Sequence, residues 1–365
     1  MPIVANVLAM SVHPFAVVET ALVFAAARRP TIPNRQIGDD PADAVSQSQA
    51  NPMPHLPDTL EDFHVHGATA PEWNQRYVQL SSGRMSSRLR HLATDGLHIY
   101  RKWMSERVAQ DGCLPPGKIC FAMLARPIGE TPRMQGRDLL GNRLFVLRGG
   151  DDFSLQRPRD MELLAVTFEA EDFRRHCEEA PWSASARALL SRTAVDCNAR
   201  SLARLRLLLQ TMFRGATAAT TTDSQQLANG RVFAVLTELF QSATQARQPI
   251  ASASASAIVV RCHQIVAASG DAPPSIEELC ASLRTSRRTL QNSFMAVANT
   301  TPVHYLRSVR LAAARMQLLS PPAAASVTEV ALAHGFTHLG HFSGNYKALF
   351  GESPSDSVSQ LGGGK

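Results

Sequence analysis

The sequence lacks the short motifs that most often identify an enzyme. It contains no G-x-S-x-G, P-loop, G-x-G-x-x-G or H-E-x-x-H pattern, which are signatures of nucleophilic, phosphate-binding, dinucleotide-binding and zinc chemistry. The cluster His176-Cys177-Glu178 has no recognisable partner, and adjacent residues on a helix face different ways. We therefore predict a protein that is not an enzyme and requires no cofactor, although an active site built from scattered residues would leave no such motif.

Cysteine is scarce, and the cysteines that occur do not form a motif. The six are spread along the chain without a C-x-x-C pair: Cys113, Cys120, Cys177, Cys197, Cys262 and Cys280. Small secreted domains carry a much denser set, and zinc sites use closely spaced pairs. The pattern predicts reduced thiols in a cytoplasmic protein.

Charge is nearly absent from the first 27 residues, where Glu19 is the one formally charged side chain. A secretory signal would place positive charge before its apolar run, but Arg28 and Arg29 follow it. A membrane span needs about 20 apolar residues, and polar residues interrupt this segment. We expect residues 1–60 to be a poorly ordered extension with no membrane role, and Met53 could be the biological start.

Helix capping signals stand out in residues 275–356, which predict two helix-turn-helix units. The first unit opens at Ser275 with the capping box S-I-E-E, and Ser286 is the expected N-cap of its second helix. That helix would bury its apolar residues, Leu290, Phe294 and Val297. Its polar face carries side chains suited to base edges in the major groove: Arg287, Arg288, Gln291 and Asn292.

A single long helix is expected between the two units, from about Pro302 to Leu319. About 18 residues would span roughly 27 Å at about 1.5 Å per residue, so this helix could hold two reading heads about one DNA turn apart. Its apolar stripe is predicted at residues three and four apart: Leu306, Val309, Ala313 and Met316.

The second unit repeats the pattern. Ser326 opens the capping box S-V-T-E, Gly335 can supply the positive φ of a turn, and Thr337 is the expected cap of the next helix. Inward packing is predicted for the apolar residues Val327, Val330, Leu332, Leu339, Phe342 and Tyr346. The polar candidates for DNA contact are His341, Ser343, Asn345 and Lys347, and Gly351 ends the helix.

The charge of the chain suits a polyanionic partner. The net charge is +6, and residues 275–350 hold seven Lys/Arg against three Asp/Glu. Phosphate attraction requires such an excess at the DNA-binding surface. Double-stranded DNA is therefore the expected partner.

Residues 61–170 change character and predict the β-rich part of a sensor domain that extends over 61–247. Short apolar or alternating runs predict strands at Tyr77–Leu80, Leu97–Trp103, Ile119–Leu124, Leu144–Leu147, Phe153–Gln156 and Leu163–Phe168. Gly149-Gly150 predicts a hairpin between two of them. This spacing favours an antiparallel barrel or a double-sheet jelly roll. We expect a jelly-roll or cupin-like fold, which can enclose a small effector. The whole chain is then of the α+β class.

Helices are expected after the strands. Three are predicted from apolar residues. The first begins at Phe173–Cys177, the second is marked by Leu202, Leu205, Leu209 and Met212, and the third by Leu227, Leu236, Leu239 and Phe240. They would pack on the sensor or support a homodimer. Residues 248–257 predict a linker. The DNA-binding domain would occupy 258–357, opening with a helix at Ile258–Ala268, and 358–365 would form a flexible tail.

The residues that predict the two units resemble the AraC/XylS family of bacterial transcription regulators. The resemblance rests on S-I-E-E-L-C-A-S-L-R-T-S-R-R-T-L-Q-N-S-F from Ser275 and on G-F-T-H-L-G-H-F-S-G-N-Y-K-A-L-F-G-E-S-P-S from Gly335. It implies that both second helices enter successive major grooves, through Arg288, Gln291 and Asn292 in one and Leu339, Gly340, His341 and Ser343 in the other. It further implies RNA polymerase as a partner and activation of a catabolic operon. Gly344 stands where the family often has Arg, which predicts weaker base reading by the second unit.

Two stretches resemble a narrower group, the regulators related to the ethanolamine-utilisation activator. They are W-N-Q-R-Y-V-Q-L-S-S-G-R-M from Trp73 and L-F-V-L-R-G-G-D-D-F-S-L from Leu144. In that activator ethanolamine and a cobalamin cofactor are the inducers. No pocket residue can be matched, so the effector of this chain stays open.

Two other functions compete with an effector-responsive regulator. A metal-dependent jelly-roll enzyme fused to a helical domain would use His64 and His66 as ligands, but no third ligand stands at a familiar spacing. An architectural protein would bind DNA without any effector.

Overall fold

The computed structural model describes residues 73–94, 96–139, 141–179, 188–215, 222–245, 253–270, 273–319 and 326–362. These residues all belong to one compact unit, His55–Lys365. The expectations for residues 1–60, the possible start at Met53 and the candidate ligands His64 and His66 lie outside the described residues. None of the described helices is both long and apolar enough to cross a membrane.

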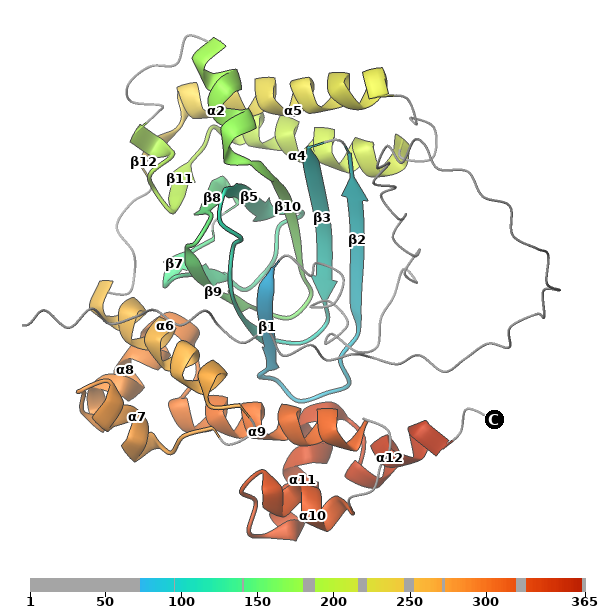
Figure 1. The fold of residues 1–365 in the computed structure, drawn as a ribbon, viewed down its shortest axis with the longest axis vertical. Coiled ribbons are helices and arrows are strands. Elements are labelled where there is room, and N and C mark those ends of the chain that lie inside the picture. Colours follow the sequence, from blue (N-terminus) through green and yellow to red (C-terminus); the bar gives the residue numbers. More distant parts are fainter. Residues whose placement is uncertain are drawn as a thin grey trace, which may run out of the picture. The chain divides into compact units, whose positions relative to one another are not determined.

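The β-rich region consists of two antiparallel sheets (Figure 1). The larger sheet has the order β12-β11-β8-β5-β10-β3-β2, with strands at Thr244–Gln245, Ala194–Asp196, Arg143–Arg148, Lys118–Leu124, Met161–Glu169, Leu97–Met104 and Ser87–Ala93. The smaller sheet has the order β1-β4-β9-β6-β7, with strands at Asn74–Gln79, Val108–Cys113, Asp152–Arg157, Arg133–Met134 and Arg137–Asp138. The mixed α and β composition agrees with the expected class.

All six predicted strands are present, but the sequence did not predict β2 or β4. In β2 the exposed residues Arg88 and Arg90 flank the buried Leu89, and their other neighbours, Ser87 and His91, are polar. β4 buries Gln110 and Asp111, which an apolar pattern does not anticipate. Both strands are therefore too polar in sequence to be recognised from apolar runs.

The hairpin predicted at Gly149-Gly150 is wrong. The strands on either side, β8 and β9, lie in different sheets, so this turn carries the chain from one sheet to the other. A Cβ atom at Gly149 would lie 2.6 Å from the backbone nitrogen of Gly117, and Gly150 has a φ of +83°. The glycines are needed for a close approach and a positive φ rather than for a two-residue hairpin.

The larger sheet is buried on both faces. Along β5, Ile119, Phe121 and Met123 belong to the core shared with the helices, whereas Cys120 and Ala122 belong to the core between the sheets. The helices that cover the first face are α2 (Ala170–Glu179), α4 (Ala199–Gly215) and α5 (Thr222–Ser242). This two-sided burial explains the continuous apolar run of β5. Leu227 was expected in this core, but 59% of it is exposed.

The remaining helices form the C-terminal part of the described chain. They are α6 (Ala253–Ala268), α7 (Ile276–Ser282), α8 (Arg287–Ala298), α9 (Pro302–Leu318), α10 (Val327–Ala333), α11 (Leu339–Phe350) and α12 (Pro354–Gly362). α6 begins at Ala253 rather than at Ile258, because the alanine-rich repeat is helical instead of forming the end of a linker. α12 likewise continues through 358–362, where a flexible tail was expected.

α9 belongs to two separate apolar cores. Tyr305 and Leu306 pack with α6 and α8, while Leu311 and Leu318 pack with α10 and α11. The single stripe predicted on this helix is therefore wrong in part, and Met316 is 50% exposed. One helix thus connects two helix pairs, each with its own core.

Candidate nucleic-acid interface and buried pocket

The first helix pair is fixed by the predicted caps. The Ser275 hydroxyl accepts a hydrogen bond from the Glu278 backbone N–H at 3.2 Å, and the Glu278 carboxylate accepts from the Ser275 N–H at 2.7 Å. The Ser286 hydroxyl accepts from the Thr289 N–H at 3.0 Å and starts α8. Leu290, Phe294 and Val297 are buried as predicted, which leaves the opposite face of α8 in solvent.

All four candidate DNA-binding residues of α8 are exposed: Arg287, Arg288, Gln291 and Asn292. They differ in one respect that the sequence did not reveal. Arg287 forms an ion pair with Glu277 of α7. Arg288 forms no ion pair with any residue that the structure describes. Of these two arginines, Arg288 therefore has the guanidinium that is available to an external acceptor.

The second helix pair repeats the capping box but not the second cap. Ser326 and Glu329 exchange hydrogen bonds of 3.2 Å and 2.6 Å, and Gly335 has the expected positive φ, +78°. The N-cap of α11 is His338, which makes no side-chain capping bond, so the prediction for Thr337 is wrong. Leu332 and Leu339 are 54% and 40% exposed, contrary to expectation, because the short helices bury only one narrow face.

The polar candidates on α11 are less uniform than those on α8. His341, Ser343 and Lys347 are exposed, whereas Asn345 is half-buried. Asn345 and His341 line a groove of about 540 Å³ with Arg307 and Arg310 of α9. The sequence did not single out these two arginines, because their position between the helix pairs depends on the packing of α9.

Backbone carbonyls at the C-terminal ends of α8 and α11 accept hydrogen bonds from the β-rich region. Arg133 donates to the Ala296 carbonyl at 3.0 Å, and Arg107 donates to the Asn299 carbonyl at 3.2 Å. Gln79 of β1 donates to the Leu349 carbonyl at 2.6 Å. The last carbonyls of a helix lack partners within the helix, so these donors fix both helix ends.

A buried polar cluster joins β1 and β4 to α6 and α9. The Arg76 guanidinium donates to the Tyr305 hydroxyl at 2.8 Å and to the His263 carbonyl at 3.0 Å. The His263 Nδ1 atom lies 2.5 Å from an Asp111 carboxylate oxygen. Burial alone would raise the pKa of Asp111, but His263 and Arg76 hold it below its usual range.

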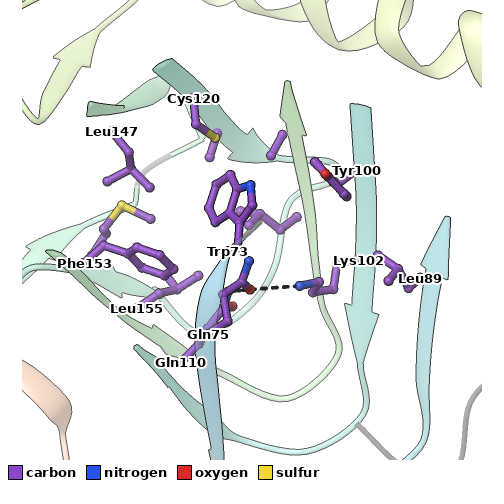
Figure 2. A pocket seen from close by; sticks show the side chains of 14 residues that line it. Trp73, Gln75, Leu89, Tyr100, Lys102, Gln110, Cys120, Leu147, Phe153 and Leu155 are labelled. Carbon is purple, nitrogen blue, oxygen red and sulfur yellow. Dashed lines mark hydrogen bonds between the residues drawn. The ribbon is translucent and has the colours of Figure 1, made fainter. Parts of the chain in front are cut away.

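The opposite face of the same two strands lines a pocket between the sheets. Side chains alternate along a strand, so Gln75 and Gln110 point into the pocket while Arg76 and Asp111 point to the helices. The cavity has a volume of about 40 Å³. Figure 2 shows the Trp73 indole among the apolar lining residues and Lys102 hydrogen-bonded to Gln75.

Two cationic side chains are buried at the polar end of this pocket: Lys102, which lines it, and Arg157, which donates to the lining residue Gln110. Lys102 is 7% exposed and Arg157 is 1% exposed. Burial, together with the nearby Arg157, lowers the pKa of Lys102 to about 7. Burial also lowers the pKa of Arg157 to about 10, although Tyr77 opposes this shift. Sequence inspection did not find this site, because neither residue stands in a motif.

Comparisons with known proteins place the helical region in a family. Residues 279–359 match the family described as "Helix-turn-helix domain". The chain is 45% identical over 87 residues to the XylDLEGF operon transcriptional activator of Pseudomonas putida, covering 24% of this chain and 27% of that protein. It is 39% identical over 87 residues to the "Probable thc operon regulatory protein" of Rhodococcus erythropolis, covering 24% and 26%.

Part of the chain is also similar in sequence to a solved structure. The chain is 31% identical to a probable AraC family transcriptional regulator from Rhodopseudomonas palustris, covering 28% of this chain and 96% of that one, with a TM-score of 0.27. The matched part spans about a quarter of the length of the curated relatives. These relatives are described as a transcriptional activator and as a probable operon regulatory protein. The chain therefore carries a DNA-binding helix-turn-helix domain of the AraC family.

Proposed function

We propose that the protein is a transcription regulator that reads DNA with both helix pairs and responds to a small effector bound between its sheets. The observation that carries this proposal is the mounting of two capped helix pairs on α9. α9 has 17 residues and is about 25 Å long, which is of the order of one DNA turn. We propose that each pair is a helix-turn-helix unit and that α8 and α11 enter successive major grooves.

The exposed side chains suggest different roles for the two units. Arg288, Gln291 and Asn292 suit hydrogen bonding to base edges. Lys347 and the exposed Arg307 suit phosphate contacts, which anchor the protein without reading sequence. His341 and Ser343 would add contacts at the second groove, and Arg287, already paired with Glu277, would contribute less.

The effector response would travel through β1 and β4. One face of these strands lines the pocket, and the other face holds the cluster of Arg76, Asp111 and His263 against α6 and α9. A ligand that moves the strands would change this contact and the hydrogen bond from Gln79 to the Leu349 carbonyl of α11. The ligand can shift the protein only through a different affinity for the two arrangements.

The proposed domain organisation takes the sequence predictions as its starting point. We propose a jelly-roll sensor within 61–247, a DNA-binding domain that runs from α6 at Ala253 to the end of α12 at Gly362, and contacts with RNA polymerase during activation. A homodimer and a cytoplasmic location fit this function. Membership of the ethanolamine-operon group would not extend to its ligand, because two buried cations disfavour a positively charged amine in this pocket.

Selection of bound sequences from a random DNA pool tests the proposal. The full chain is used at a stated salt concentration, because phosphate contacts make affinity depend on salt. We expect enrichment of a site with two elements about 10 base pairs apart. Enrichment of a single element would reject reading by both units, and no enrichment under any condition would reject sequence-specific binding.

A further inference from the structure

Three hydrogen-bond donors converge on one amide oxygen at the polar end of the pocket. The Gln75 amide oxygen accepts from Lys102 at 3.3 Å, from Gln110 at 3.0 Å and from the Tyr77 hydroxyl. One neutral oxygen thus serves three converging donors, one of which is an ammonium group. Such convergence is the arrangement by which proteins bind an anionic oxygen.

The buried charge at this end is also uncompensated. Arg157 contacts the Gln110 amide oxygen at 3.3 Å and two backbone carbonyls, at 3.1 Å and 3.2 Å. Within the described part of the chain, no carboxylate forms an ion pair with Lys102 or Arg157, in contrast to Arg76 beside Asp111. Buried charges are normally paired, because an isolated ion loses its hydration and gains no counter-ion to offset that loss.

The rest of the pocket is apolar. Its lining includes Tyr100, Phe153 and Leu155. The Trp73 ring lies edge-on to Tyr100 and Phe153, with centroids 6.3 Å and 6.1 Å apart. Figure 2 shows this ring occupying the middle of the site, between the two sheets. The free volume of about 40 Å³ therefore admits a body of only a few carbon atoms.

We propose that this pocket is the site of a small aliphatic carboxylate, whose oxygens bind the Lys102 ammonium and the Gln110 amide and whose carbon body contacts Trp73. The inference rests on the proposed function, in which this pocket is the effector site, and gives the effector its chemical class. The carboxylate takes over the donors that now converge on Gln75, and its charge balances the buried cations. Trp73 limits the length of the ligand.

Calorimetry and thermal unfolding of the full chain test the proposal with propionate and butyrate as probes. Propionamide and propylamine, which share the carbon body without the negative charge, are the matched controls at constant ionic strength. We expect both carboxylates to bind and to raise the melting temperature, and both controls to fail. Equal binding of the amide, or no binding of either carboxylate at millimolar concentration, overturns the proposal.

The variant Lys102→Met keeps the length of the side chain and removes the charge. We expect it to fold, because an apolar residue replaces a buried cation, and to bind propionate roughly 10- to 100-fold more weakly. Lys118→Met, on β5 outside the pocket lining, is the control and should bind as the parent does. Unchanged binding by Lys102→Met contradicts the site. Trp73→Ala should extend binding to benzoate, which the parent excludes.

The charge state of Lys102 gives a second readout. Its pKa of about 7 leaves most of the side chain neutral at pH 8, and a bound carboxylate would restore the proton. Of the titratable groups that face it, Tyr77 and Cys120 stay neutral because burial raises the pKa of each, and Arg157 stays charged with a pKa of about 10. Calorimetry at pH 8 in two buffers of different ionisation enthalpy should detect proton uptake. Binding without proton uptake contradicts the role of Lys102.

DNA-binding assays separate this proposal from the proposed function. Loss of propionate binding in Lys102→Met, with operator binding retained, supports the carboxylate site and leaves the DNA-reading function intact. Propionate binding that leaves operator affinity unchanged supports the site but rejects its role as the effector site. A response of operator binding to a neutral or cationic ligand in the same pocket overturns the carboxylate class alone.

Discussion

The first helices of the two pairs begin in the same way, but the second helices differ. α7 and α10 both begin with a complete capping box. α8 then starts with a side-chain cap at Ser286 and presents two arginines, whereas α11 starts at His338 without a capping bond and contains Gly340 and Gly344. The common part holds each pair together, and the variable part sets what the exposed helix can contact. We therefore propose that the first pair supplies most of the base reading and the second supplies anchoring.

The largest expected effect is on sequence discrimination by α8. Arg288→Ala should reduce discrimination at one base pair by about 1–3 kcal/mol, because a bidentate contact to a base is lost. Arg287→Ala, which removes a side chain already paired with Glu277, should change it less, as should His341→Ala on α11. Competition binding with operator variants measures all three. Equal losses for the three variants would remove the distinction between the units.

The second largest effect is expected on the free energy of unfolding, from loss of the N-cap of α8. Ser286→Ala leaves the Thr289 N–H without its acceptor and should lower the free energy of unfolding by about 1 kcal/mol. His338→Ala at the matching position of α11 removes no capping bond and should change it little. Urea unfolding of both variants checks this, and the comparison fails if the two losses are the same.

Gly344 should give an effect of opposite sign. An added Cβ atom there meets nothing within 4 Å, so Gly344→Ala should raise the free energy of unfolding by about 0.5–1 kcal/mol. Gly351→Ala is the control and should destabilise, because its φ is +74° and its Cβ atom would lie 2.9 Å from the Arg84 backbone nitrogen. Thermal unfolding measures both, and destabilisation by Gly344→Ala would indicate that α11 needs the glycine.

The smallest expected effect is a change in salt dependence. Lys347→Ala should weaken binding to all sequences alike and reduce the slope of log affinity against log salt by about one. Arg288→Ala should alter sequence preference more than this slope. Titrations at several salt concentrations with two operator sequences test the contrast. A change in preference caused by Lys347→Ala would assign it to base reading instead.

Features decided by neighbouring residues were predictable from the sequence. Both capping boxes depend on a serine and a glutamate three residues apart, and the apolar face of α8 depends on helical spacing alone. The turn at Gly149-Gly150 was misassigned because the sheet that each flanking strand joins is decided by distant pairing. Lys102 and Arg157 read as surface residues in a sequence, and only the packing of two sheets buries them.

In the candidate interface, too, features decided by neighbouring residues were predictable and features decided by distant packing were not. The exposed positions on α8 were predictable from periodicity, but those on α11 only in part, because Leu339 is exposed and Asn345 is half-buried. The ion pair between Arg287 and Glu277 depends on how α7 packs against α8. The polar strand β4 was missed because its polar residues have partners far away, such as His263, 152 positions beyond Asp111. Long-range partners of this kind leave no local pattern.

The division of α9 between two cores has a consequence for how operators can change over time. Because α9 is packed at both ends, it fixes the distance between the two helix pairs and the angle of one pair relative to the other. Inserting or deleting one base pair between the two elements rotates one of them by about 35° around the DNA axis, and a packed helix cannot follow that rotation. Point substitutions can therefore tune an operator gradually, whereas a single-base insertion or deletion between its elements should abolish simultaneous binding at once.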